Sequence, residues 1–461
     1  MDRREFLKVA GAATAWVLAG CSDAGTLTSS PTTAPAPPTS AAVRRPNLVL
    51  IMADDLGYET LGAYGGVSYA TPHLDRLAAS GLRFEHAYSN PMCQPTRVKL
   101  LTGKYNFRNY IPHGELTPDQ HTWAHALQAA GYATCAVGKW QLNIYGNGTP
   151  PEAAGFDEHC MWNVEPWRDG LDDPATIPVR YWNPEIVVNG EKMTDTEGRY
   201  GPDIFTEYGI DFVERHRDEP FLLYFPTNLP HSPHQPPPGH PNADAQIPSD
   251  SNDPVYYAPM VEYLDGLVGR IVAGLERLGL REDTIVMFTG DNGTPSQITS
   301  SLADGAPIKG AKASLKDGGI HVPLIANWPG TIAAGVTDAL VDYSDWFPTI
   351  AELTGAHRPE DLDGVSFAPV LLNGDAGRRE WVFVYFWRPD GGLRGWFAAD
   401  RAWKLHGDGR LIDLSSDRRE RRPVLEGSSP EADAARTRLQ GVLDDLLAGV
   451  DHNWPPHVWR A

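Results

Sequence analysis

Two pairs of oxygen-bearing side chains each follow a short apolar run of the chain. Asp54 and Asp55 end the first run, and Asp291 and Asn292 come shortly after a later one. Adjacent carboxylates repel each other unless a cation compensates their charge, and three carboxylates with one amide oxygen form a hard, all-oxygen set. Either pair alone is also typical of a turn. Two pairs in equivalent places favour a Ca²⁺ or Mg²⁺ site and argue against zinc.

Basic side chains occur in several other loops. They are Arg97, Lys139, His231 and Lys312. Each one taken singly is typical of a solvated surface charge. A metal ion flanked by fixed positive groups, however, is a site for a multiply charged anion, because such groups stabilise charge as it develops. The set predicts chemistry on an anionic group if the fold brings these loops together.

A cysteine with polar neighbours stands between two prolines in the stretch PMCQPTRVKL, residues 91–100. Structural cysteines are usually buried among apolar residues, so this environment is unusual for a cysteine that only packs. The residues after Cys93 predict a helix that begins near it, where unpaired backbone N–H groups stabilise anions. These residues alone leave open whether Cys93 is a thiol in the working protein.

Buried strands and amphipathic helices must position these candidates. Short runs rich in branched or aromatic residues predict fully buried strands at 47–53, 134–137, 221–225 and 284–288. Segments with helical periodicity lie between them, at 72–80, 121–130, 204–217 and 256–278. The alternation predicts an α/β fold with a large mixed, mostly parallel sheet sandwiched by helices. In such folds, sites form beyond the carboxyl ends of the strands.

The chain changes character from about Arg379. Short, aromatic-rich alternating pieces separated by turns predict antiparallel strands, and a helix is expected over about 432–447. We expect a catalytic domain over 46–378 and a smaller C-terminal α+β subdomain over 379–461.

The first 45 residues predict export and tethering. Within residues 1–21, Arg3 and Arg4 precede a short apolar run that resembles a twin-arginine signal, and the stretch ending at Cys21 resembles a bacterial lipobox. An ordinary cleaved signal with an incidental cysteine is the alternative. Residues 22–45, rich in Ser, Thr and Pro, predict a flexible tether. We expect a protein of the bacterial cell envelope that is exported and lipid-anchored at Cys21, on the periplasmic or cell-surface face.

Composition excludes some classes of function. The net charge of −20 and the isoelectric point near 5.1 argue against a nucleic-acid binder, which would carry a basic surface. Besides Cys21 the chain holds only Cys93, Cys135 and Cys160, so no disulfide framework is expected. Cys135 and Cys160 are open to pairing in an oxidising compartment or to burial as free thiols.

The segment around Cys93 resembles a known family motif. Cys93-Gln94-Pro95-Thr96-Arg97 matches the C-x-P-x-R core of the type I, formylglycine-dependent sulfatases of the alkaline-phosphatase-like superfamily. The resemblance runs from about residue 46 to the C-terminus. Further landmarks follow in the family's order, at 47–55, 71–78, 101–103, 291–293, 312–329 and 345–349.

The resemblance implies a cofactor made from the chain itself. A formylglycine-generating maturase would oxidise Cys93 to formylglycine, and the hydrated aldehyde would be the nucleophile. Asp54, Asp55, Asp291 and Asn292 would hold the divalent ion, Ca²⁺ in most of the family with Mg²⁺ as the alternative, together with the group formed from Cys93.

The resemblance also implies roles for the basic residues. Arg97 would steady the diol, and Lys139 would bridge the diol and the sulfate. His231 and Lys312 would bind sulfate and assist the leaving alkoxide.

Two positions depart from the family pattern. Thr96 stands where Ser or Ala is usual, and conversion of Cys93 is expected to survive this change. Gln141 in Gly138-Lys139-Trp140-Gln141-Leu142 stands where the family has a histidine that takes a proton as sulfate is expelled. Glutamine can hydrogen-bond the diol but accepts no proton near neutral pH.

The expected activity is hydrolysis of sulfate esters of small molecules or, more specifically, of sulfated glycans. A phosphodiester or phosphonate monoester hydrolase of the same superfamily is an alternative. A lipoprotein that binds sulfated ligands without catalysis is another, because of Gln141. No nucleic-acid partner is expected, and the only membrane contact expected is a lipid at Cys21.

Overall fold

The computed structural model describes residues 45–109, 114–144, 148–164, 179–244, 247–248, 251–388, 392–450 and 452. The predicted signal, the candidate anchor Cys21 and the tether up to residue 44 lie outside these residues. Among the described helices, none is both long and apolar enough to cross a membrane.

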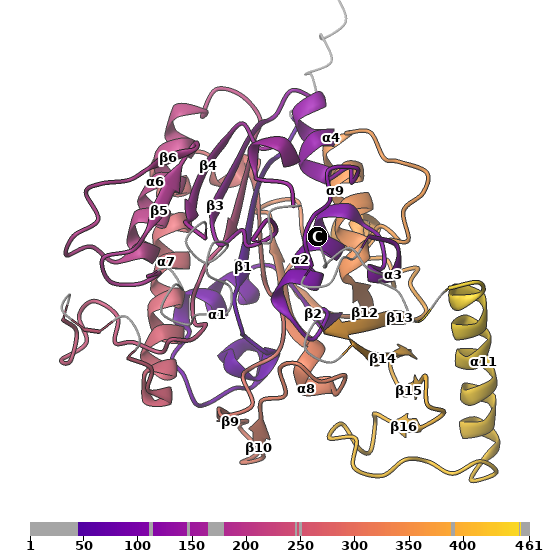
Figure 1. The fold of residues 1–461 in the computed structure, drawn as a ribbon. Coiled ribbons are helices and arrows are strands. Elements are labelled where there is room, and N and C mark those ends of the chain that lie inside the picture. The colour runs from indigo at the N-terminus through magenta and orange to yellow at the C-terminus, as the bar shows by residue number, and fades with distance from the viewer. Residues whose placement is uncertain are drawn as a thin grey trace, which may run out of the picture. The chain divides into compact units, whose positions relative to one another are not determined.

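A ten-stranded sheet is the framework of the protein (Figure 1), with the order β12-β2-β11-β8-β1-β7-β3-β4-β5-β6. The neighbours β8, β1, β7, β3 and β4 run parallel, so their carboxyl ends meet at one edge. The strands are β1 (Asn47–Ala53), β2 (Leu82–Tyr88), β3 (Ala133–Gly138), β4 (Glu158–Trp162), β5 (Ile186–Val188), β6 (Glu191–Lys192), β7 (Phe221–Pro226), β8 (Thr284–Gly290), β11 (His321–Asn327) and β12 (Gly335–Asp342).

Strand β1 shows why a continuous apolar run is needed at the centre of this sheet. All of its residues are buried. Successive side chains point to opposite faces, so Leu50 and Met52 join one core cluster while Val49 and Ile51 join the other. Both faces of the sheet must therefore be covered.

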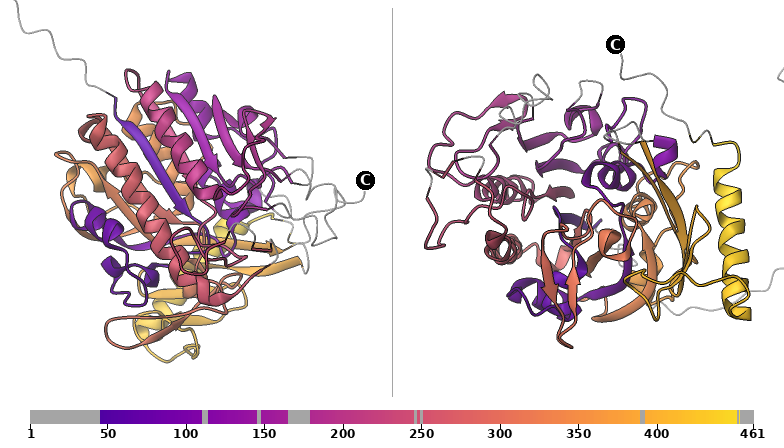
Figure 2. Two further views of the ribbon diagram at one scale, coloured as in Figure 1. Left: turned by 90° about the vertical axis from the view of Figure 1, so that its left-hand side faces the viewer. Right: turned by 60° about the horizontal axis from the view of Figure 1, so that its bottom comes forward.

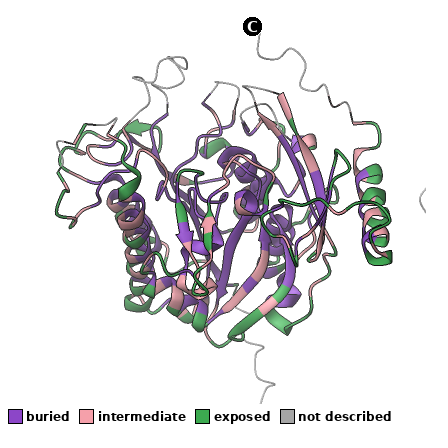
Figure 3. Ribbon diagram, turned by 90° about the horizontal axis from the view of Figure 1, so that it is seen from below, coloured by how far each residue is buried: buried purple, intermediate pink, exposed green. Residues whose placement is uncertain are grey.

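Two layers of helices cover those faces (Figure 2). Seen from below, buried strands lie between helices whose outer surfaces are exposed (Figure 3). The helices of the core cluster that includes Val49 are α1 (Pro72–Ala79), α6 (Gly201–Arg215) and α7 (Tyr257–Arg277). Those of the other cluster are α2 (Cys93–Thr102), α4 (Trp123–Ala129), α9 (Trp346–Thr354) and α10 (Ala368–Asn373). Shorter elements are α3 (Asn106–Asn109), α8 (Asp317–Ile320) and the hairpin of β9 (Thr299–Ser301) and β10 (Pro307–Lys309).

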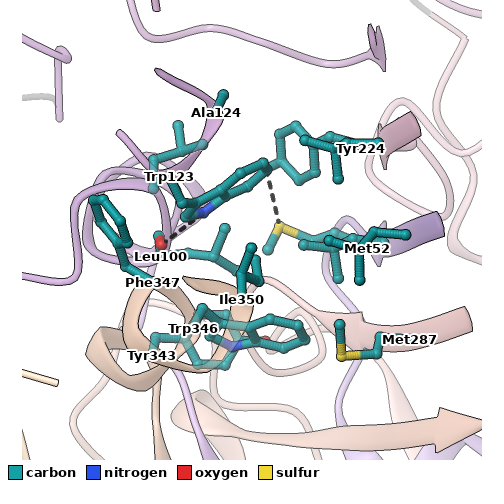
Figure 4. Packing of buried hydrophobic residues seen from close by; sticks show 14 of the residues in the cluster. Met52, Leu100, Trp123, Ala124, Tyr224, Met287, Tyr343, Trp346, Phe347 and Ile350 are labelled. Atoms are coloured by element: carbon teal, nitrogen blue, oxygen red, sulfur yellow. Dashed lines mark hydrogen bonds between the residues drawn. The ribbon is translucent and has the colours of Figure 1, made fainter. Parts of the chain in front are cut away.

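Helix α2 is fixed against the sheet by packing and by buried polar contacts (Figure 4). The indole N–H of Trp123 in α4 donates to the carbonyl of Leu100 in α2 at 3.0 Å, and the Tyr224 hydroxyl lies 3.7 Å from the Met52 sulfur of β1. Buried Trp and Tyr side chains need such partners for their polar atoms. The Trp123 ring also packs edge-on against Tyr224 of β7, with ring centroids 5.5 Å apart, so α4 links the helix that carries Cys93 to the sheet.

A second, antiparallel sheet lies beyond β12, and helix α11 (Pro430–Leu447) packs on it through Leu439 and Leu443 (Figure 1). Lys99 of α2 donates to the carbonyl of Phe383 at 2.8 Å, so α2 also contacts this sheet. Its strands are β13 (Val382–Arg388), β14 (Gly392–Ala399), β15 (Trp403–His406) and β16 (Leu411–Asp413).

The predicted fold class is confirmed. The four predicted strands are β1, β3, β7 and β8, and the predicted helices correspond to α1, α4, α6 and α7 within a few residues. The sequence did not predict β11, which pairs antiparallel with both β2 and β8. Cys135 and Cys160, on the neighbouring strands β3 and β4, are buried free thiols.

Candidate active site

Helix α2 begins at Cys93, as the sequence predicts. Met92 before it is extended, and Gly103 closes the helix in the left-handed conformation that favours glycine (φ 67°). The Thr96 hydroxyl donates to the carbonyl of Met92 at 2.8 Å and accepts from the Asn90 N–H at 3.0 Å. Thr96, the first departure from the family motif, therefore stabilises the start of the helix.

The candidate residues come together because they follow adjacent parallel strands. Asp54 and Asp55 follow β1, Asp291 and Asn292 follow β8, and Lys139 follows β3. His231 comes after β7, which lies between β1 and β3.

One glycine allows the end of β3 to approach β7. Gly138 has φ 118°, and a Cβ atom there would lie 2.3 Å from the carbonyl oxygen of Pro226. The N–H of the next residue, Lys139, donates to that same carbonyl at 2.6 Å. This close approach sets the place from which the Lys139 side chain reaches Asp54.

Three carboxylates and three cationic side chains form a site cluster in which every member except the partly exposed Lys312 is buried. Lys139 Nζ lies 2.6 Å from Asp54 Oδ2, and Lys312 Nζ lies 2.5 Å from Asp55 Oδ1. The Arg97 guanidinium donates to Asp291 Oδ2 at 2.8 Å and to the carbonyl of Lys139, also at 2.8 Å. The members of the site cluster are Asp54, Asp55, Asp291, Arg97, Lys139 and Lys312.

Burial and neighbouring charge shift the pKa values of these carboxyls in opposite directions. Burial alone would raise the pKa of Asp54 and Asp55, but the ammonium groups of Lys139 and Lys312 hold both pKa values well below their ordinary range. Burial and the neighbouring Asp54 carboxylate raise the pKa of Asp291 to about 7. Three carboxylates here are not readily ionised together without a further cation.

The oxygen atoms of this site fit a hard divalent cation. Among the described residues, Asp54 Oδ1 and Asn292 Oδ1 are buried without a hydrogen-bond partner. Ligand atoms of Asp54, Cys93 and Asp291 lie within 4.8 Å of one another. Asn292 Nδ2 donates to Asp55 Oδ1 at 2.8 Å, which leaves the amide oxygen free for another contact. Buried unpaired oxygens are costly unless a ligand satisfies them, so the donor set suits Ca²⁺ or Mg²⁺.

Gln141 lies beside the cysteine helix. Its backbone has φ 61°, and its carbonyl accepts a hydrogen bond from Gln94, the residue after Cys93, at 3.0 Å. The side chain is 5% exposed, and Oε1 has no hydrogen-bond partner among the described residues. An acceptor oxygen therefore stands where the family's histidine would be.

His231 lies next to the site cluster, beside Asp55. Its Nε2 lies 3.7 Å from Asp55 Oδ2. Burial and the charge of Lys312 lower the pKa of His231 to about 3, so the imidazole is neutral at pH 7. The structure thus brings all ten predicted residues to one edge of the sheet.

Sequence reasoning missed two buried basic residues at this edge. Arg180 Nη1 lies 2.9 Å from His231 Nδ1. His234 is fully buried, and neither of its ring nitrogens has a hydrogen-bond partner among the described residues. Both residues occur in irregular loops rather than directly after a strand, so position gave no signal. The H-S-P-H spacing from His231 was the only available pointer to His234.

A cavity of about 630 Å³ lies elsewhere, beside the β9–β10 hairpin, with Tyr58, Lys309, Asp317 and Arg418 among its lining residues. None of the ten predicted residues lines it.

The protein has a mixed α/β sheet, a set of carboxylates at the carboxyl edge of that sheet, and a cysteine at a helix start beside them. This combination is that of a hydrolase of the alkaline-phosphatase-like superfamily. Residues 46–356 match the family model Sulfatase, and residues 311–434 match the model described as N-sulphoglucosamine sulphohydrolase, C-terminal. The chain belongs to the sulfatase family and is a sulfuric-ester hydrolase.

Curated relatives cover most of the chain. It is 33% identical over 469 residues to human arylsulfatase A, covering 89% of this chain and 90% of that protein. It is also 33% identical to mouse N-acetylgalactosamine-6-sulfatase, covering 75% of this chain and 70% of that protein.

Solved structures share the fold. Ps i-CgsB superposes with a TM-score of 0.71 at 26% identity, covering 89% of this chain and 94% of that one. The phosphonate monoester hydrolase of Agrobacterium radiobacter superposes with a TM-score of 0.63 at 21% identity, covering 88% and 96%. At that identity the similarity concerns the fold alone.

Proposed function

We propose that this sulfatase cleaves sulfate esters of glycans with formylglycine derived from Cys93 as nucleophile and Ca²⁺ as the resident metal. Asp54, Asp55, Asp291 and Asn292 would hold the ion. The observation that carries the proposal is the convergence of Cys93, at the start of α2, with the carboxylates of the site cluster, beside the unpaired oxygens of Asp54 and Asn292.

The group formed from Cys93 and the metal ion together would supply an activated oxygen nucleophile. A thiol at this position is poorly suited to that role, because burial raises the pKa of Cys93 and keeps the sulfur protonated. Conversion of Cys93 by a formylglycine-generating maturase therefore belongs to the proposal.

The cationic side chains would bind the sulfate group. Lys139 and Lys312 extend into the site from two different loops, and their ammonium groups supply positive charge on both sides of the carboxylates. Arg97 holds Asp291 and the Lys139 backbone in place through its two donor groups. Neutral His231 offers a hydrogen bond to the sulfate or to the leaving oxygen.

Gln141 would orient a hydroxyl group through its unpaired Oε1 and leave the proton to water. Glutamine accepts a hydrogen bond but not a proton. In this proposal a water molecule accepts the proton that a side-chain base would otherwise take, and no further side chain is required.

Several similarities support a sulfated carbohydrate as the substrate. The model that matches residues 311–434 is named for an N-sulphoglucosamine sulphohydrolase, and one curated relative is an N-acetylgalactosamine-6-sulfatase. Ps i-CgsB, which is 26% identical, has a structure in complex with k-i-k-neocarrahexaose.

Peptide mass spectrometry across residues 91–100, combined with a desulfation assay, tests the proposal. After co-expression with a maturase, we expect the mass change of thiol-to-aldehyde conversion, and sulfate release from a panel of sulfated mono- and oligosaccharides. Cys93→Ala is the matched control and should release none. An unmodified thiol in an active protein would refute the nucleophile, and faster turnover of an aryl phosphodiester than of an aryl sulfate would refute the substrate class.

We also propose that the protein is exported by a twin-arginine signal and anchored in the bacterial envelope by a lipid on Cys21. The support is the order of the two motifs in residues 1–21. In a Gram-negative or Gram-positive host, Cys21→Ala should move the protein from the membrane fraction to the soluble fraction. An unchanged distribution would refute the anchor.

A further inference from the structure

Arg180 is a buried cation beside the active site that no carboxylate of the described residues pairs with. It lies between β4 and β5 and is 6% exposed. Its guanidinium carbon lies 4.1 Å from the centre of the Trp162 indole ring, and its Nη1 lies 2.9 Å from His231 Nδ1. The Ser232 carbonyl oxygen also lies 2.5 Å from His231 Nδ1. Among the described residues, no Asp or Glu forms an ion pair with Arg180, and its Nε has no hydrogen-bond partner.

The position of Arg180 is fixed by its neighbour. The Tyr181 hydroxyl donates to the carbonyl of Asn228 at 2.7 Å, which ties this loop to the segment that carries His231. On the other side of the imidazole ring, His231 Nε2 faces Asp55 Oδ2 at 3.7 Å. Arg180 and Asp55 therefore lie on opposite sides of the His231 ring, so that the imidazole separates Arg180 from the site cluster.

The charge balance of the site does not need Arg180. Arg97, Lys139 and Lys312 each pair with a carboxylate of the site cluster, and the proposed divalent ion would add further positive charge there. A buried guanidinium without an anion lowers stability, and aromatic stacking offsets only part of that cost. Such a residue is explained most simply by an anion that arrives with the ligand.

We propose that Arg180 binds a second anionic group of the substrate, a carboxylate or a further sulfate adjacent to the sulfate ester that is cleaved. This inference rests on the proposed sulfatase activity and narrows the substrate to a polyanionic sugar unit. A guanidinium suits this task because its planar donors match the oxygens of carboxylate and sulfate.

Three aryl esters test this assignment by kinetics. The probes are phenyl sulfate, 2-carboxyphenyl sulfate and catechol disulfate, which differ only in the second anionic group. We expect the wild-type enzyme to prefer the two doubly anionic esters, chiefly through KM. Arg180→Met should lower the ratio of their kcat/KM to that of phenyl sulfate by about tenfold or more, and Arg180→Lys by less. Whichever of the two doubly anionic esters has the higher kcat/KM shows whether Arg180 prefers a carboxylate or a sulfate. An equal ratio in wild type and Arg180→Met would overturn the proposal.

Thermal stability without ligand gives an independent answer. Arg379 is the matched control, since it is also buried but donates to Asp345 Oδ2 at 2.6 Å. Arg379→Met should lower the melting temperature because it leaves Asp345 unpaired, whereas Arg180→Met should leave it unchanged or raise it. A loss in Arg180→Met as large as in Arg379→Met would assign Arg180 a structural role and overturn the proposal.

Failure of the proposed activity remains distinguishable from failure of this inference. If no ester is hydrolysed, the proposed function fails. Calorimetric binding of catechol disulfate and phenyl sulfate to Cys93→Ala, with and without Arg180→Met, then decides the role of Arg180. Loss of the preference for the disulfate in the double variant supports the proposal, and an unchanged preference refutes it.

Discussion

Helix α2 contacts two charge clusters, one on each of two faces, and the clusters differ in whether their polar atoms all have hydrogen-bond partners. Arg97 belongs to the site cluster, whereas Lys99, two residues on, belongs to a junction cluster of Lys99, Asp342, Asp345 and Arg379. In the junction cluster, Lys99 Nζ lies 2.8 Å from Asp342 Oδ1, and Arg379 Nε donates to Asp345 Oδ2 at 2.6 Å.

The two clusters differ in the hydrogen bonding of their polar side-chain atoms and of the atoms beside them. Among the described residues, none of the junction cluster's side-chain atoms lacks a hydrogen-bond partner, whereas Asp54 Oδ1, Asn292 Oδ1, Gln141 Oε1 and Arg180 Nε all do at the active site. A buried network that is fully satisfied stabilises one arrangement, and unsatisfied atoms are tolerated where a ligand completes them. Of these two charge clusters, the one with unpaired polar atoms in and beside it is the candidate functional site.

Metal removal should cause the largest loss of activity, because the metal would be bound at the site cluster and not at the junction cluster. Chelation followed by gel filtration is expected to reduce sulfate release by about 10³-fold or more, because the metal would both activate the nucleophile and neutralise developing charge. Re-addition of Ca²⁺, with Mg²⁺ assayed separately, should restore activity. Activity that persists after exhaustive chelation would contradict the metal assignment.

Breaking the junction cluster should affect stability rather than metal binding. Lys99→Met leaves Asp342 buried without its cation and is expected to cost about 3–5 kcal/mol in the free energy of unfolding, measured by urea denaturation. The double variant Lys99→Met/Asp342→Asn should recover part of that loss. Equal stability of Lys99→Met and wild type would show that the junction charges are unimportant.

The effect of Ca²⁺ on stability should depend on pH through Asp291. Its pKa in the folded, metal-free protein is about 7, above the ordinary value of 3.8. The protonated form therefore stabilises the fold fully below about pH 4, and this contribution is lost as the pH rises to 7. Because Ca²⁺ displaces that proton, the increase in melting temperature caused by Ca²⁺ should grow from pH 5 to pH 8. Asp291→Asn should abolish this trend, and a pH-independent increase in wild type would contradict it.

The smallest effect is expected at Gln141. Gln141→His would restore a side-chain base at a place where an unpaired acceptor already stands, so we expect kcat to rise by less than about tenfold. A single-turnover assay of sulfate release measures this step. A large loss of turnover would show that Gln141 has its own role in a reorganised site.

The sequence predicted the parts of the fold and site that depend on local pattern. Apolar runs that end in charged or turn residues predicted β1, β3, β7 and β8. The carboxyl ends of these strands predicted the places of Asp54, Asp55, Lys139, His231, Asp291 and Asn292. The signal was strong because strands buried on both faces must be continuously apolar.

The missed parts depend on contacts far apart in the chain. Strand β12 has exposed residues along its first half, and β11 contains Pro323, so neither reads as a central strand. Arg180 gave no signal because an arginine in a loop is ordinarily solvated, and only the fold places it against Trp162 and His231.

The burial of α2 has a consequence for the biosynthesis of the enzyme. All ten residues of the helix are buried, and Cys93 itself is 5% exposed. A maturase would have no access to this thiol once the chain has folded, so the proposed conversion of Cys93 would have to precede folding of the newly made chain. We expect a maturase to convert an unfolded chain or a peptide of residues 91–100 but not the folded, unmodified protein. Conversion of the folded protein at the rate of the peptide would show that α2 opens.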